Sequence, residues 1–88
     1  MVVTAFSLGE AQDMQGNQLL AVHDYVDEFG RIVIPQGATV SVIGMDAWDF
    51  NDAVIAVQSH GLFPRVVLLN KTEYEHYFEN LSASSLAT

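Results

Sequence analysis

The chain has 88 residues, half of them apolar, and carries a formal net charge of −8 at pH 7 with no cysteine. This length and composition predict one folded domain over residues 1–81, with a frayed tail over 82–88. The missing cysteine excludes disulfides and thiolate catalysis. The acidic charge disfavours direct binding to nucleic acids or anionic membranes, because both depend on Lys and Arg side chains.

The first third of the chain alternates between strand-like and turn-like segments. Residues 1–6 and 18–26 are rich in β-branched and aliphatic residues and predict strands, although the period leaves open which side chains of 18–26 face inward. Between them, residues 7–17 contain two glycines and predict a loop or at most one helical turn. Residues 27–30 (Asp-Glu-Phe-Gly) predict a turn into a short strand over 31–34.

The middle of the chain continues in the same manner. Residues 38–44 alternate cleanly, with Val40 and Val42 on one face, and predict a strand. Residues 46–52 hold three aspartates around two large rings and predict a loop. Two more strands are expected over 53–58 and 63–69. Five to six short strands with close turns favour a mainly β barrel or sandwich.

A short C-terminal helix is expected after the last strand. Thr72 followed by Glu75 three residues later is a capping-box pattern, which predicts that the helix begins there. Four apolar side chains then follow at helical spacing: Tyr74, Tyr77, Phe78 and Leu81. We expect this stripe to pack onto the core and close an open end or edge of the barrel.

Several short motifs resemble the Src-homology-three family, whose members are five-stranded barrels that bind proline-rich peptides. Ala21-Val22-His23-Asp24-Tyr25 resembles the family's Ala-Leu-Tyr-Asp-Tyr motif, and Gly61-Leu62-Phe63-Pro64 resembles a late segment of the family. The resemblance implies a small barrel of five to six strands with Tyr25, Trp48 and Pro64 in the peptide groove. His23 and Val67 stand where the family has further tyrosines, so fewer rings pave the groove here.

In that family, carboxylates of two long loops pair with a basic residue of the ligand. The resemblance therefore implies two acidic loops that face each other across one cleft, and Arg is well suited to such a cleft because its planar fork binds carboxylates. The six carboxylates are Asp24, Asp27, Glu28, Asp46, Asp49 and Asp52. The alternative is that they are ordinary solvated turn residues. Trp48 is either an exposed anchor beside them or a buried plug of the core.

No cluster in the sequence predicts catalysis, a metal or a cofactor. His23 and Asp24 are neighbours in an expected strand, which points their side chains to opposite faces. His60 and His76 stand alone in the sequence, and a metal site needs three or four ligands. The aspartates of 46–52 lack the spacing of a calcium loop. We therefore expect that the protein is not an enzyme. A buried pocket lined by titratable groups with perturbed pKa values would favour an enzyme instead.

Two functions remain open from the sequence. The first is a cytoplasmic interaction module that presents an acidic cleft to a basic protein or peptide, including an inhibitor or a bacteriophage protein that imitates phosphate. The second is a structural subunit of a homo-oligomer or of a larger assembly, such as a phage particle or an enzyme complex, because short sheets leave exposed edges. A third possibility is that the acidity serves solubility alone.

Overall fold

The computed structural model describes residues 5–48, 51–62 and 64–81. Its described residues form two short helices and seven strands, and most of the regular structure is β. Their order is α1 (Leu8–Asp13), β1 (Gln18–Ala21), β2 (Tyr25–Val26), β3 (Ile32–Ile34), β4 (Thr39–Ala47), β5 (Ala53–Ser59), β6 (Val66–Leu69), α2 (Lys71–Tyr77) and β7 (Phe78–Asn80). The predicted mainly β class with a C-terminal helix is confirmed.

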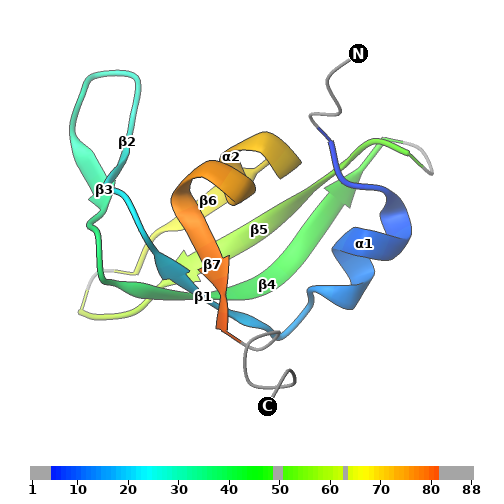
Figure 1. Ribbon diagram of the computed structural model, residues 1–88, viewed down its shortest axis with the longest axis horizontal. Coiled ribbons are helices and arrows are strands. Elements are labelled where there is room, and N and C mark those ends of the chain that lie inside the picture. Colours follow the sequence, from blue (N-terminus) through cyan, green and yellow to red (C-terminus); the bar gives the residue numbers. More distant parts are fainter. Residues whose placement is uncertain (1–4, 49–50, 63, 82–88) are drawn as a thin grey trace.

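Five strands form one antiparallel sheet in the order β6-β5-β4-β1-β7 (Figure 1). β4 is the long central strand and pairs with β5 from Val40↔Ser59 to Ala47↔Ala53. A bulge between Val42 and Gly44 interrupts this register and bends β4, as an extra residue in one strand does. Within the described part of the chain, β2 and β3 pair only with each other, and they form a hairpin that projects from the body.

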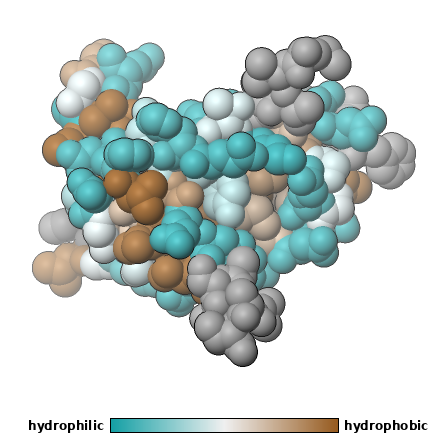
Figure 2. All heavy atoms as spheres, in the orientation of Figure 1, coloured by the Kyte–Doolittle hydropathy of each residue, from teal (hydrophilic) through white to brown (hydrophobic). Residues whose placement is uncertain are grey.

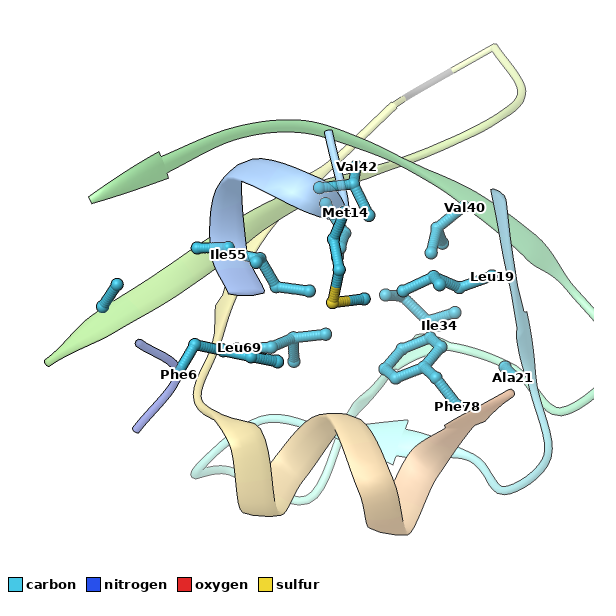
Figure 3. Packing of buried hydrophobic residues seen from close by; sticks show 13 residues of the cluster. Phe6, Met14, Leu19, Ala21, Ile34, Val40, Val42, Ile55, Leu69 and Phe78 are labelled. Carbon is cyan, nitrogen blue, oxygen red and sulfur yellow. The ribbon is translucent and has the colours of Figure 1, made fainter. Parts of the chain in front are cut away.

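The core lies between the sheet, the two helices and the base of the hairpin (Figure 3). β-strand alternation places side chains from β1, β4 and β5 in it, and the predicted inward face of Val40 and Val42 is confirmed. The largest fully buried side chains are Leu19, Ile34, Ile55, Leu69, Val40, Val42 and Val57. Within β1, Leu19 and Ala21 face inward, which settles the face that the sequence period left open.

Helix α1 occupies a segment predicted as a loop or at most one helical turn, and its six residues exceed that prediction. The side chain of Ser7 accepts a hydrogen bond from the N–H of Glu10, and Glu10 accepts one from the N–H of Ser7, which completes a capping box. Ala11 and Met14 are buried in the core, so packing holds the six-residue helix. The Gln15 side chain also donates to the C=O of Gly44 and ties the end of α1 to β4.

Helix α2 begins earlier and ends earlier than predicted. Asn70, rather than Thr72, is the N-cap, and it forms a capping box with Glu73. The helix stops at Tyr77 because Phe78 becomes extended and pairs with Ala21 of β1. Phe78 is 4% exposed, and Tyr74 and Tyr77 pack against the core. The predicted packing of this aromatic stripe onto the core is therefore confirmed for these three residues, but Phe78 belongs to strand β7 and not to the helix.

Other boundaries also move. The strand predicted over 18–26 is broken at residues 22–24, where the chain leaves the sheet for the hairpin. The loop predicted over 46–52 is shorter, since Asp46 and Ala47 still pair with β5. The strand predicted over 63–69 begins at Val66. The predictions for residues 1–4 and for the tail 82–88 fall outside the described residues.

Candidate functional site: two acidic turns

The β2–β3 hairpin carries the first group of predicted carboxylates. Asp24 accepts a 2.7 Å hydrogen bond from the N–H of Gln36 and so fastens the turn that follows β3. Asp27 accepts hydrogen bonds from the N–H groups of Phe29 and Arg31, and its other oxygen pairs with the Arg31 guanidinium at 3.0 Å. Glu28 is exposed at the tip. Two of these three carboxylates therefore stabilise the hairpin itself.

The hydrogen bonds at the tip change the acidity of Asp27. The N–H of Arg31, then that of Phe29 and the guanidinium, hold the pKa of Asp27 below its ordinary value. Each of these donors stabilises the ionised form. The carboxylate is charged across the physiological range and already has a cationic partner, which leaves it less available to a ligand.

Tyr25 connects the hairpin to α2 instead of lining an open groove. Its ring meets Tyr77 edge-on at 5.1 Å between centroids, and its hydroxyl donates to Glu73 Oε2 at 3.3 Å. Burial, followed by the negative charge of Glu73, raises the pKa of Tyr25 to about 12. A half-buried tyrosine with a partner on α2 acts first as a structural contact.

The β4–β5 turn carries the second group. The N–H of Trp48 donates to the C=O of Asp52 at 2.9 Å and closes the turn. Trp48 is 68% exposed, which decides the alternative left open by the sequence in favour of an exposed ring. Asp46 and Asp52 are exposed, and no described residue forms an ion pair with either. Asp49, the third predicted carboxylate of this group, lies outside the described residues.

The structure does not bring the two acidic groups together. Figure 1 shows the β2–β3 hairpin and the β4–β5 turn at opposite ends of the molecule. Pro64 lies in the connection between β5 and β6, before β6 rather than between β6 and the helix. The expectation of one cleft lined by both groups is therefore wrong. The predicted residues divide into a hairpin group, a turn group and an isolated proline.

Exposed apolar side chains mark surfaces that the sequence analysis did not single out. On the hairpin, Phe29 is 73% exposed beneath the Arg31 guanidinium, and the cross-strand pair Val26 and Ile32 is also exposed. Figure 2 shows brown apolar atoms among teal ones on this hairpin, at the upper left. Elsewhere, Val66 and Leu68 are exposed on β6. The four residues of β6 are all apolar, so the sequence did not show which of them face outward.

The three histidines take part in structural contacts at two separate places. The rings of His23 and His76 stack at 5.2 Å, which joins the chain after β1 to α2, and His60 lies 3.2 Å from the Ser41 hydroxyl. Among residues 5–48, 51–62 and 64–81, no three His, Asp or Glu side chains gather as metal ligands. No helix in this part of the chain has the length and apolar character to span a membrane.

Comparisons with protein-family models, curated proteins and solved structures found no match to this chain.

Proposed function

We propose that this protein is a non-catalytic interaction module that binds a basic protein or peptide surface through its β4–β5 turn. The observation that carries the proposal is Trp48, a large ring 68% exposed between two carboxylates without an in-chain cation among the described residues. Exposed aromatic anchors concentrate binding energy at protein interfaces. The flanking Asp46 and Asp52 add attraction for Arg or Lys, and the net charge of −8 steers a basic partner toward the molecule.

We also propose that the fold is a small barrel of the Src-homology-three type. The support is the element order: a long hairpin follows the first sheet strand, and a helix separates the last two strands of a five-stranded sheet. We do not extend the proposal to proline-rich ligands. Tyr25 is engaged by α2, and Pro64 lies on a different connection from Trp48.

Trp48 is the single tryptophan of the chain, so its fluorescence reports directly on this turn. An arginine-rich peptide is titrated into the protein, and its affinity is measured as salt is increased. We expect Trp48→Ala to weaken binding by roughly 30-fold, the effect of losing a hot spot of about 2 kcal/mol, measured with a labelled peptide. Asp46→Asn with Asp52→Asn should lower both the affinity and its salt dependence.

A matched pair of exposed carboxylates elsewhere provides the control. Asp13→Asn with Glu79→Gln removes the same charge without touching the turn. If this pair weakens peptide binding as much as the Asp46 and Asp52 pair does, only the overall charge attracts the peptide and the proposed site is wrong. Capture from the native host then tests the partner class: the proposal requires basic partners that salt releases.

A further inference from the structure

Strand β6 leaves one of its two sides without backbone partners among the described residues. The N–H of Ser59 donates to the C=O of Arg65, and the N–H of Arg65 donates to the Ser59 hydroxyl, so Ser59 and Arg65 occupy a hydrogen-bonded position of the ladder. Such pairs alternate along an antiparallel ladder, which makes Val57↔Val67 and Ile55↔Leu69 the next bonded pairs. The N–H and C=O groups of Val66 and Leu68 therefore point away from β5, toward the open edge of the sheet.

The two residues with outward backbone groups lie symmetrically about Val67. When an identical strand approaches antiparallel, with a two-fold axis beside Val67, Val66 faces Leu68 of the second copy and Leu68 faces its Val66. Each facing pair exchanges two N–H···O=C bonds, so every outward group of both strands is used. The side chains of Val66 and Leu68, 57% and 53% exposed, then lie side by side across the junction.

Charge also favours this edge as the place where two copies meet. Residues 53–72 contain Arg65 and Lys71 but no Asp or Glu, whereas the other 68 residues hold all eleven carboxylates and one arginine. Two molecules of net charge −8 repel each other over most of their surfaces. The β5–β6 hairpin is the long stretch of the chain that carries no carboxylate, and the exposed side chains on β6 itself, Val66 and Leu68, are apolar.

We propose that β6 is a homodimerisation strand, which pairs antiparallel with β6 of a second copy and joins two five-stranded sheets into one. An unprotected edge strand is a ready template for such pairing. The proposed contact uses neither Trp48 nor the β4–β5 turn, so the dimer and the basic partner do not compete for the same residues.

Leu68→Pro tests the backbone contact. Proline removes the outward N–H, which no described acceptor in the chain uses, and proline is tolerated at positions of this kind in edge strands. We expect the wild type to form concentration-dependent dimers in sedimentation equilibrium, and Leu68→Pro to remain a monomer with an unchanged far-ultraviolet spectrum. Ile43 on β4 is about as exposed as Leu68, so Ile43→Lys serves as the control and should dimerise like the wild type.

A charge exchange tests the register without relying on proline. Val66→Lys combined with Leu68→Lys places like charges opposite each other across the two-fold axis and should abolish the dimer. Val66→Lys combined with Leu68→Glu places opposite charges there and should restore it. Amide exchange supplies the structural readout: Val66 and Leu68 gain protection only in the dimer, whereas Val67 is protected in the monomer too.

The effect of salt on affinity distinguishes self-association from an alternative contact, in which an acidic strand of another protein binds beside Arg65. Salt screens the repulsion between two acidic molecules, so the dimer should tighten as salt is added. A wild type that stays monomeric at millimolar concentration overturns the proposal. So does a dimer that the folded Leu68→Pro and double-lysine variants retain, because its contact then lies elsewhere.

Discussion

At the scale of single residues, polar side chains do most of their work within the chain. Asp24 and Asp27 hold the hairpin, Tyr25 joins it to α2, and Glu73 serves both Tyr25 and the cap of α2. The sequence does not separate such structural carboxylates from ligand-binding ones, because both are the same residue types and both occur in turns. What separates them from Asp46 and Asp52 is the presence of donors within reach, which depends on tertiary contacts.

The hydrogen bond between Tyr25 and Glu73 gives a pH-dependent prediction. The pKa of Tyr25 is about 12 in the folded chain and about 10 in an unfolded one, so folding favours the protonated phenol. Its contribution to stability is complete below about pH 10 and is lost as the pH rises through 10 to 12. Tyrosinate absorbance should show a late-titrating residue that is missing from Tyr25→Phe.

The same substitution should lower the free energy of unfolding by about 0.5–1 kcal/mol at neutral pH, the usual net value of one hydrogen bond. Tyr77→Phe is the control, since no described residue forms a hydrogen bond with the Tyr77 hydroxyl. Urea denaturation measures both variants. Equal losses from the two would mean that the bond to Glu73 contributes nothing to the attachment of the hairpin.

Asp27 gives the opposite pH dependence. Because its folded pKa lies below the ordinary value, its contribution is present at neutral pH and is lost as the pH falls through the lowered folded pKa. Asp27→Ala should speed amide exchange at Phe29 and Arg31, whose N–H groups lose their acceptor. Asp27→Asn keeps an acceptor oxygen and should preserve more of this protection. Exchange that is unchanged in Asp27→Ala would contradict the role of Asp27 at the tip.

At the scale of elements, local chemistry predicts strands well and helix ends poorly. The alternation around Val40 and Val42 was enough to predict β4, because a strand with one buried face has an apolar residue at every second position. Helix α1 was missed although Ser7 and Glu10 have the same spacing as a capping box. Strand β7 had no local signal, because Phe78 follows helical spacing and becomes extended only by pairing with β1.

The cap of α2 can be tested against the one that the sequence favoured. Asn70→Ala removes the side-chain acceptor for the N–H of Glu73 and should cost about 1 kcal/mol, within a range of roughly 0.5–2 kcal/mol for N-caps. Thr72→Ala, at the position the sequence analysis assigned to the cap, should change stability much less because Thr72 is exposed within the first turn. Urea midpoints give the comparison. A larger loss from Thr72→Ala would place the start of the helix at Thr72 after all.

At the scale of the whole molecule, charge and topology divide the surface. The described acidic residues lie on or next to the β2–β3 hairpin, beside the β4–β5 turn, on both helices and on β7, and residues 53–72 contain none. The sequence predicted turns near both acidic groups, although Asp46 belongs to β4. It also joined the two groups in one cleft, because the resemblance supplied their arrangement and local patterns do not contain it.

The uneven charge predicts that salt stabilises the folded chain. The chain carries a net charge of −8 in a molecule whose principal extents are 36 × 34 × 24 Å. The described residues form two salt bridges, Asp27 with Arg31 and Glu10 with Lys71, and both are solvent-exposed. Screening weakens the repulsion among many carboxylates and costs little at exposed pairs, because exposed ion pairs contribute only about 0–1 kcal/mol each. The urea midpoint should therefore rise when sodium chloride is added at neutral pH.

A variant with less charge separates screening from other effects of salt. Asp13→Lys, Glu28→Lys and Glu79→Lys reverse three exposed charges with no described ion pair and change the net charge from −8 to −2, since each reversal adds two. Its urea midpoint should be higher than that of the wild type in low salt and should respond less to sodium chloride. If both proteins gain the same stability from salt, then the gain comes from salting-out of apolar surface, and repulsion among the acidic turns does not limit the stability of this fold.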